Sequence, residues 1–532
     1  MGWTQVYDPM QNIWFSALIA AIPVLFFFLG LTVFKMKAYV AAGSTVIISI
    51  ITAIMFYKMP VNMVVGAAGY GAVYAIWPIA YIIIAALFLY KLSVKSGQFD
   101  VIRQSIVSIT DDPRLQMLLV AFSFNAFLEG AAGFGAPIAI TAALLVGLGF
   151  NPLKAAALCL IANTASGAFG AMGIPVIVAG QVSGIDAKEI SRFLGYSLPY
   201  ISFAVPFLLV MIMDGFKGVR EVWKQTFVTA STYAIAQYLT ITFIGPELPN
   251  IIASLVSLLA LALYIKATNK QEAPASARKL SAGQIAKAWS PFIALTLFVT
   301  TWSLNFFKGL FAPGGLLEKT NVLIEIPGLH NQVIKASPLV IEPTPYAAVL
   351  KLDILAATGS AIAIAGIVSM FILKVDFKTG KETLAETVKE LSKPIFTIMM
   401  VLAFAFVANY SGQSSTLGLA LANTADVFPF LSPALGWIGV FLTGSVVSNN
   451  ALFGSLQTTT ASQIQVLPII LVAANTAGGV MAKMLSPQSI AVATGAVGLV
   501  GKEAELFRFT LKYSIGFLVL AGIITFVQAL LL

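Results

Sequence analysis

Apolar runs of roughly 20 residues recur along the whole chain, and each is long enough to cross a lipid bilayer as a helix. The first, residues 12–34, lacks a basic start and is too long for a cleaved signal peptide. Hydrophobic residues make up 59% of the 532 residues and charged residues 10%, whereas soluble domains carry about 25% charged residues. We therefore predict an all-α polytopic membrane protein with about 12 crossings.

The basic residues are distributed by loop and are not gathered in one patch. The formal net charge of +9 could indicate a nucleic-acid partner. Lysines and arginines are instead concentrated in alternate loops, as the positive-inside rule expects. If Lys35 and Lys37 are cytoplasmic, five more basic loops share that side, near Lys91, Lys217, Lys266, Lys374 and Lys502. The charges therefore predict topology in a lipid bilayer and no nucleic-acid binding.

Few residues can support redox or metal chemistry. The one cysteine, Cys159, lies in an apolar stretch, and the one histidine, His330, lies in a polar loop. A disulfide framework and a thiolate metal site are excluded, so we expect no metal and no cofactor. The sequence also lacks a nucleophile–base arrangement, a phosphate-binding loop and a soluble output domain. These absences argue against an enzyme and against a receptor.

Two polar, helix-breaking segments interrupt the apolar sequence. Residues 163–175 read NTASGAFGAMGIP, and residues 475–487, which begin 312 positions later, read NTAGGVMAKMLSP. Both segments place Gly at the fifth position and Pro at the thirteenth. Each follows a segment with a related motif, AGFG in the first case and ALFG in the second. The chain is therefore expected to contain an internal repeat with discontinuous helices.

The segments before these breaks are predicted to form two re-entrant hairpins. Residues 114–150 and 435–466 each place two short arms around a polar or glycine-rich centre. We expect the hairpin tips, residues 129–137 and 448–454, to gate one site from opposite faces. The alternative for the first segment is two short tilted spans joined by a tight turn. The charge pattern makes the first hairpin open from the cytoplasm and the second from outside, so the repeats are predicted to be inverted.

The repeats divide the chain into two membrane halves. We place the halves at residues 1–265 and 284–532, joined by a polar, basic cytoplasmic linker at residues 266–283. A full span is expected near residues 189–213 and a long external loop over residues 307–345.

Shorter interruptions are expected elsewhere in the chain. Residues 60–90 are too long for one straight crossing and should be broken near GAAGYGAVYAIWP. Residues 395–428 should form one crossing interrupted at NYSGQSS. Residues 97–113 and 378–394 are predicted to be amphipathic helices on the cytoplasmic surface.

Interrupted helices inside a membrane indicate a binding site. An unpaired backbone group in hydrocarbon costs several kcal/mol, so non-helical chain at depth requires protein or a water-filled cavity around it. Inverted repeats with matching breaks point to the midplane site of a secondary transporter. Helix N-termini that begin after a break carry partial positive charge and free N–H donors, which suit an anion. The alternative is that small residues there merely permit close helix packing.

The predicted substrate site collects neutral polar groups. The breaks supply Asn163, Thr164, Ser166, Asn475 and Thr476. The hairpin tips supply Gly133, Gly135, Ser448, Asn449 and Asn450. Because no long basic cluster points inward, a small monoanion that also hydrogen-bonds through a hydroxyl fits better than a phosphate or a tricarboxylate.

Four ionisable residues are predicted at membrane depth, where such groups are functional candidates. Lys483 lies in the second break, where the first repeat has Ala171, and is expected to meet a carboxylate or else to snorkel to the cytoplasmic face. Lys351 and Asp353 open a predicted span and could instead form an interfacial ion pair. Glu129 lies at the first hairpin tip.

Glu129 is the favoured carrier of a coupled proton, ahead of Asp353. Apolar surroundings favour the neutral form of a carboxyl group. No basic residue lies within ten positions of Glu129, whereas Lys351 is two residues from Asp353. The alternative is that Glu129 only caps its helix or ties the hairpin tip to a neighbour.

Long stretches of the chain resemble the bacterial lactate permease family, from YDPMQNIW at Tyr7 to the last span. The resemblance is carried by strings such as AFLEGAAGFGAPIAITAALLVGLGF, MVLAFAFVANYSGQSSTLGLAL and VAANTAGGVMAKMLSPQSIAVATGAVGLVGKEAELFRF. It implies a plasma-membrane secondary transporter that takes up lactate, and often glycolate, together with a proton. It also implies a relationship to ion transporters with two re-entrant hairpins, and hence an elevator-like motion.

One departure from the family pattern bears on coupling. Family members commonly read Gly-Ser-Asp-Thr in this segment. This chain has Val446 and Val447 in place of the aspartate and the threonine. If that aspartate carries protons, this chain must use another group, such as Glu129 or Asp353. A sodium-coupled or differently selective carboxylate carrier is the alternative, and the sequence leaves the oligomeric state open.

Overall fold

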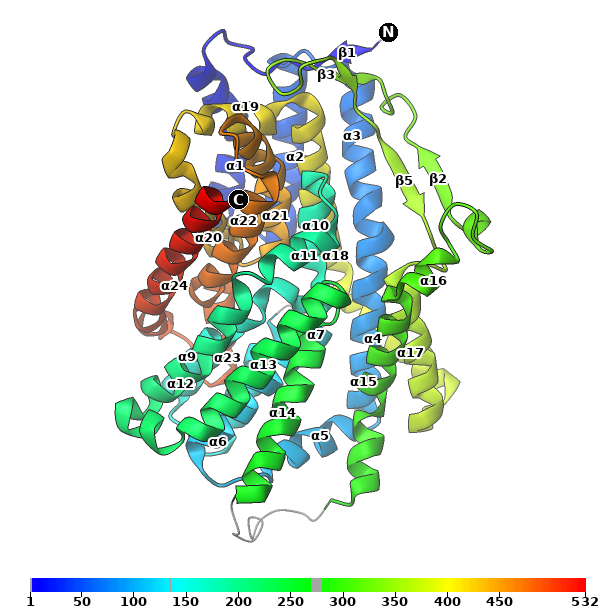
Figure 1. The fold of residues 1–532 in the computed structure, drawn as a ribbon. Coiled ribbons are helices and arrows are strands. Elements are labelled where there is room, and N and C mark those ends of the chain that lie inside the picture. The colour runs from blue at the N-terminus through cyan, green and yellow to red at the C-terminus, as the bar shows by residue number, and fades with distance from the viewer. Residues whose placement is uncertain (1, 134, 269–279) are drawn as a thin grey trace.

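The computed structural model describes residues 2–133, 135–268 and 280–532, and its regular structure is almost entirely helical (Figure 1). Within the described residues, ten helices are long and apolar enough to cross a membrane, or up to eleven if one bent pair counts as a span. The predicted all-α polytopic membrane protein is thus confirmed. The expected number of about 12 crossings stays a prediction, since helices such as α17 (Thr358–Leu373) are apolar but shorter than a typical span.

The first elements include the interruption predicted within residues 60–90. Trp77 leaves the helical region of backbone space inside η1, a π-helical turn that joins α3 to α4. The predicted amphipathic helix is α5, which lies across the lower end of the molecule in Figure 1. The elements are β1 (Trp3–Thr4), α1 (Ile13–Thr32), α2 (Ala38–Met55), α3 (Val61–Tyr74), η1 (Ala75–Ala80), α4 (Tyr81–Lys95) and α5 (Gln98–Val107).

The first predicted hairpin is a helix–turn–helix. Gly133 and Gly135 form its turn at φ values of +58° and +88°, which glycine adopts without a steric penalty. At the open end, Arg114 pairs with Asp214 and Glu221 of α12 (Leu198–Glu221), with nitrogen–oxygen distances of 3.1 and 2.5 Å. The arms are α6 (Pro113–Met117), η2 (Leu118–Phe124) and α7 (Asn125–Ala131), followed by α8 (Ala136–Gly147).

The predicted break at residues 163–175 is confirmed. The helix pair on its two sides bends by 68°, and Ala171, Met172 and Gly173 all have positive φ. The predicted start of the span over residues 189–213 was wrong. A short helix, α11, ends at Leu194, and the long helix α12 begins only at Leu198. These elements are α9 (Pro152–Ala162), η3 (Asn163–Ala165), η4 (Gly167–Phe169), α10 (Gly170–Ser183), α11 (Ala187–Leu194), α12 (Leu198–Glu221), α13 (Trp223–Phe243) and α14 (Pro249–Thr268).

The linker and the external loop separate this part from the C-terminal half. Residues 269–279 of the predicted linker lie outside the described residues. The expected external loop over residues 307–345 contains β2, β3 and β4, which pair with β1 at the N-terminus and with β5 just after the loop to form two small sheets, β1-β3-β4 and β2-β5. The elements are α15 (Ala282–Ser303), α16 (Asn305–Gly309), η5 (Glu318–Thr320), β2 (Val322–Glu325), β3 (Val333–Lys335), β4 (Thr344–Pro345) and β5 (Val349–Leu352).

The helix α18 (Phe377–Ser411) joins two elements that the sequence analysis kept separate. The prediction of an independent surface helix over residues 378–394 was wrong, because the helix continues through Pro394. It ends at Gly412, which has a φ of +93°, so the predicted interruption at NYSGQSS is confirmed. The next element is α19 (Gln413–Ala422).

The second helix–turn–helix turns at Gly444 and Ser445. The predicted tip at residues 448–454 was wrong, because Ser445 caps α21 (Val446–Gln463) and these residues lie inside that helix. Gln463 at the far end of α21 donates a hydrogen bond to the carbonyl oxygen of Pro338 in the external loop, at 3.1 Å. The two helix–turn–helix units are therefore anchored at opposite ends of the molecule.

The C-terminal helices place this second unit beside the core. In the window spanning α22 and η7, 83% of the residues are buried, compared with 28% in the window of α24. The interrupted helices thus form the centre, and the uninterrupted helix α24 faces outward. The elements are η6 (Ala425–Val427), α20 (Phe428–Thr443), α21 (Val446–Gln463), α22 (Pro468–Ala482), η7 (Lys483–Leu485), α23 (Pro487–Ala496) and α24 (Glu503–Leu531).

Single cysteines should report the two open ends from opposite sides of the membrane. In a Cys159→Ser background, Asp111→Cys lies before the first unit and Leu467→Cys after the second, and both positions are exposed. Because the positive-inside rule places the first end in the cytoplasm, a membrane-impermeant maleimide should label Leu467→Cys in intact cells and Asp111→Cys only in inverted vesicles. Labelling of both cysteines from the same side would contradict the topology.

Candidate functional site

A cavity of about 590 Å³ lies where the two turns and the two interrupted helices meet. The first turn contributes Gly133 and Gly135, and the second contributes a run from Thr443 to Ser448. The opposite wall comes from α1, α2 and the middle of α18. Segments that are more than 300 residues apart in the sequence therefore close around one space.

A buried ion pair between the two halves lies at this cavity. Glu129 on α7 is only 2% exposed, and its Oε1 atom pairs with the Nζ atom of Lys483 in η7. Asn163 Nδ2 donates a hydrogen bond to the other carboxylate oxygen, Oε2, at 3.0 Å. Lys483 thus pairs with a carboxylate of the protein, and its expected contact with a substrate carboxylate stays a prediction. The argument that Glu129 has no cation near it was wrong, since Lys483 comes from the other half of the chain; the role of Glu129 as proton carrier stays a prediction.

Glycine makes room for the Glu129 carboxylate. A Cβ atom added at Gly170 would lie 2.5 Å from Glu129 Oε1, closer than any side chain can approach without moving the carboxylate. At Gly167 an added Cβ would lie 2.9 Å from Val480 and 3.5 Å from the side chain of Lys483. The small residues of the first break therefore bring its backbone against both members of the ion pair.

The carbonyl groups freed by the first break are satisfied by neighbouring helices. Ala165 O accepts hydrogen bonds from Gln237 Nε2 at 3.1 Å and Ser202 Oγ at 3.3 Å. Ser166 O accepts one from Asn250 Nδ2 at 2.8 Å. Protein side chains thus replace the missing helical partners, as backbone at membrane depth requires.

The predicted polar residues of the second repeat form a network of their own. Asn450 Oδ1 accepts hydrogen bonds from Asn475 Nδ2 at 3.0 Å and Thr476 Oγ1 at 3.1 Å, and Asn450 Nδ2 donates to Pro175 O at 2.9 Å. Asn449 Nδ2 donates to Asn475 O at 3.3 Å. The second break lies at the end of the predicted segment 475–487, because α22 continues to Ala482 and the backbone leaves the helix only at Ser486.

The predicted site residues therefore divide into three groups. The cavity is lined by Glu129, Lys483, Gly133, Gly135 and Ser448. Asn163 contributes to it indirectly, by donating a hydrogen bond to Glu129. Thr164 and Ser166 are buried beside the first break, while Asn449, Asn450, Asn475 and Thr476 are buried in the second network.

Asp353 lies away from the cavity. The span that it was expected to open begins only at Thr358, and Lys351 belongs to the strand β5. Lys351 Nζ lies 3.2 Å from Asp353 Oδ2, so the two residues form the ion pair that was the alternative.

Lys393 is a lining residue that the sequence analysis did not single out. It was counted among the basic residues of the predicted surface helix, because nothing in the local pattern shows that α18 continues past Pro394. Among the described lining residues, Glu129 supplies one negative charge, and Lys393 and Lys483 supply two positive charges. The cavity therefore carries one net positive charge, which suits a monoanion.

These features define a class of protein, the multi-pass membrane transporters whose interrupted helices enclose a cavity with charged groups at membrane depth. The chain belongs to the L-lactate permease family, whose sequence pattern matches residues 16–532. It is therefore a multi-pass protein of the cell membrane and a transporter, not an enzyme.

Several characterised relatives align with almost the whole chain. The glycolate permease GlcA of Escherichia coli is 56% identical over 99% of this chain and 98% of its own length. The L-lactate permease of Salmonella typhimurium is 55% identical over 100% and 98%, and that of Bacillus subtilis is 48% identical over 99% and 98%.

Two solved structures show a weak likeness. Neisseria gonorrhoeae MtrF has a TM-score of 0.45 and 14% identity, over 88% of this chain and 84% of its own. The Alcanivorax borkumensis YdaH transporter has the same TM-score and identity, over 98% of both chains. At these values neither structure bears on how this chain works.

A methyl group at Gly170 should disturb the Glu129–Lys483 pair. Gly170→Ala is expected to lower the free energy of unfolding by about 1–3 kcal/mol, the usual cost of overpacking a filled interior, and to reduce uptake of labelled L-lactate. Gly147→Ala is the matched control, because no atom lies within 4 Å of the added Cβ there. The measurements are the melting temperature of the purified protein and uptake in cells, and equal behaviour of the two variants would contradict the assignment.

Proposed function

We propose that this protein is a secondary active transporter that takes up lactate, and also glycolate or related 2-hydroxymonocarboxylates, together with a proton. The names of the relatives support the substrate class, since they include both lactate and glycolate permeases. The observation that carries the coupling proposal is the buried ion pair of Glu129 and Lys483 at the cavity.

The charges at the cavity suit a small monocarboxylate. With Glu129 ionised, Lys483 is already neutralised, and the lining keeps the single net positive charge that Lys393 brings. A tricarboxylate or a phosphate would bring more negative charge than these residues can balance. The hydroxyl of Ser448 and the backbone of the two turns supply neutral partners for a 2-hydroxyl group.

The ion pair suggests how proton and anion binding are coupled. Removing one partner from a buried ion pair leaves an uncompensated charge and typically costs about 3–5 kcal/mol. A proton on Glu129 alone would leave Lys483 uncompensated, and an anion on Lys483 alone would leave the Glu129 carboxylate uncompensated. When both bind, the proton neutralises Glu129 and the substrate carboxylate replaces it beside Lys483, so the net charge of the cavity is the same in the empty and the loaded states.

We further propose that the two helix–turn–helix units are re-entrant hairpins of inverted repeats, and that the protein works by an elevator-like motion. The anchoring of the two units at opposite ends supports this proposal, as does the short motif FLEG at residues 127–130 and FLTG at residues 441–444. The cavity lies between these units and α1, α2 and α18, which is the surface along which such a motion would occur. The halves 1–265 and 284–532 are the proposed repeats.

Sodium coupling is the second candidate, and one observation favours it. In the described part of the chain, four buried oxygen atoms near the first break have no hydrogen-bond partner: Asn163 Oδ1, Thr164 Oγ1, Gln237 Oε1 and Asn250 Oδ1. Neutral oxygen atoms are suitable ligands for a hard cation. Proton coupling is preferred because Glu129 offers a titratable group in contact with the cation that would receive the substrate.

Replacing Glu129 with Gln should separate coupling from substrate movement. Glu129→Gln imitates the protonated carboxyl group, so proteoliposomes should lose proton-driven accumulation of labelled L-lactate and keep lactate–lactate exchange. Lys483→Gln should lose both, because the cation for the substrate carboxylate is absent. Glu505→Gln is the control, since Glu505 is ion-paired with Lys502 outside the cavity. Normal proton-driven accumulation by Glu129→Gln would exclude Glu129 as the carrier.

Separate ion gradients distinguish the two coupling ions. Wild-type proteoliposomes should accumulate L-lactate when an inward proton gradient is imposed without sodium, because the proposed exchange at Glu129 requires only a proton. An inward sodium gradient at equal pH should produce no accumulation. The reverse result would assign coupling to sodium and would favour the unpaired oxygen atoms around Thr164 as the sodium ligands.

A further inference from the structure

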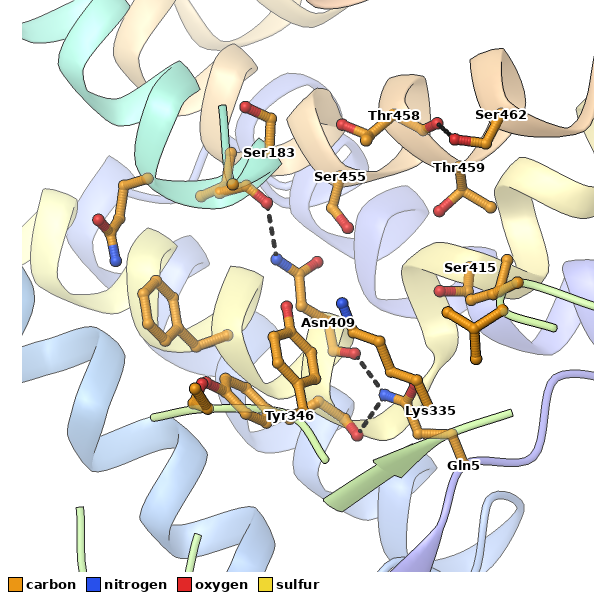
Figure 2. Close-up of a pocket in the computed structure, with 18 of the residues that line it drawn as sticks. Gln5, Ser183, Lys335, Tyr346, Asn409, Ser415, Ser455, Thr458, Thr459 and Ser462 are labelled. Atoms are coloured by element: carbon orange, nitrogen blue, oxygen red, sulfur yellow. Dashed lines mark hydrogen bonds between the residues drawn. The ribbon is translucent and has the colours of Figure 1, made fainter. Parts of the chain in front are cut away.

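A second cavity lies at the external end of the surface between the two helix–turn–helix units and the helices that pack against them. Its volume is about 290 Å³. On one side it is lined by the end of α10 and by α21, and on the other by α3, the end of α18 and the external loop between β3 and β5 (Figure 2). Gln5 closes it near the N-terminus, donating hydrogen bonds of 2.8 Å to the carbonyl oxygens of Asn409 and Tyr410.

The only charged group among the described lining residues is Lys335, at the end of β3. Its side chain is half-buried, and its Nζ atom lies 3.8 Å from the centre of the Tyr346 ring. Burial lowers the pKa of this ammonium group, because desolvation disfavours the charged form, and no carboxylate of the described chain offsets that effect. A half-buried cation without a counterion is a place where an anion lowers the free energy.

Hydroxyl groups line the cavity wall that α21 provides. Ser455, Thr458, Thr459 and Ser462 follow the i, i+3, i+4, i+7 spacing that places residues on one face of a helix, and Figure 2 shows them together. Thr458 and Ser462 donate to carbonyl groups of their own helix, at 2.9 and 3.0 Å. Within the described residues, the hydroxyls of Ser455 and Thr459 donate to no protein group, so they remain available to a ligand.

We propose that this external cavity is a separate binding site for a small 2-hydroxycarboxylate anion, with Lys335 as the partner of the carboxylate and the α21 hydroxyls as partners of the 2-hydroxyl. The inference rests on the proposed function for the identity of the anion. It concerns a site that is distinct from the Glu129–Lys483 cavity, which the two turns and the α1–α2 wall enclose.

The two cavities differ in whether their lysine has a carboxylate partner. In the inner cavity a carboxylate already neutralises Lys483, so an anion must arrive with a proton. In the external cavity Lys335 has no such partner, so an anion binds there without a proton. The external site would therefore collect the substrate anion at the membrane surface, before the coupled step.

Protection of a cysteine in this cavity tests the site directly. Val340→Cys in a Cys159→Ser background places a thiol in the lining and leaves Lys335 and the hydroxyl residues of α21 unchanged. The rate of its modification by an anionic methanethiosulfonate is measured in proteoliposomes with L-lactate, or with uncharged lactamide as the control ligand. L-lactate should slow the modification and lactamide should not, because only lactate carries the carboxylate.

Charge variants then identify the residue responsible. Lys335→Gln should raise the lactate concentration for half-protection about tenfold, the ratio expected for one lost hydrogen bond to a charged group. Lys319→Gln, an exposed cation of the same external loop outside the cavity, should not change it. Lys483→Gln should also leave protection intact, because the inner site is separate.

The outcomes separate this inference from the proposed function. Equal protection by lactate and lactamide, or protection that is lost in Lys483→Gln and kept in Lys335→Gln, would overturn the external site while wild-type uptake stays normal. Failure of the wild-type protein to transport L-lactate at all would instead overturn the proposed function.

Discussion

Backbone N–H and C=O groups in the interior of a membrane protein must find partners, and the centre of this structure is arranged around that requirement. The first break frees the carbonyl groups of Ala165 and Ser166, and side chains from α12, α13 and α14 take the place of the lost helical hydrogen bonds. Because the break is satisfied by protein, it can remain bent by 68° and bring Gly167 against Val480 and Lys483 of the C-terminal half and Gly170 against Glu129. The cavity exists because the helices around it do not need to be continuous.

The same arrangement permits a charge pair in an otherwise apolar interior. Glu129 is nearly fully buried, yet it has Lys483 on one oxygen and Asn163 on the other. Neither partner is near it in the sequence, and each comes from a different interrupted segment. A pair assembled in this way is sensitive to any movement of the two halves, since a small displacement would leave a charge without its partner. The proposed coupling uses this sensitivity: the site accepts only combinations of proton and anion that leave its net charge unchanged.

Two cavities share the surface between the hairpin helices and the helices that pack against them. The inner cavity contains the ion pair and is bounded by α1, α2 and α18, while the external one contains Lys335 and the hydroxyl face of α21. The long helix α18 contributes to both, through Lys393 in its middle and Asn409 near its end. A continuous α18 therefore provides a fixed wall along which the proposed motion would carry a substrate from one cavity toward the other.

The sequence by itself determined the class of fold, the family and the identity of the charged groups. Apolar runs of helical length, the repeated Asn-Thr-Ala segments and an unmatched Lys483 are local patterns, and local patterns are sufficient to indicate spans, breaks and candidates. Only the tertiary structure decided which candidates meet, because Glu129 and Lys483 are 354 positions apart. It also decided that Asn475 and Thr476 stay inside a continuous helix, where Asn450 satisfies their side chains, although the same letters lie at a bend in the first repeat. Whether a helix breaks at such a motif depends on the partners that neighbouring helices offer, and no segment of the sequence contains that information alone.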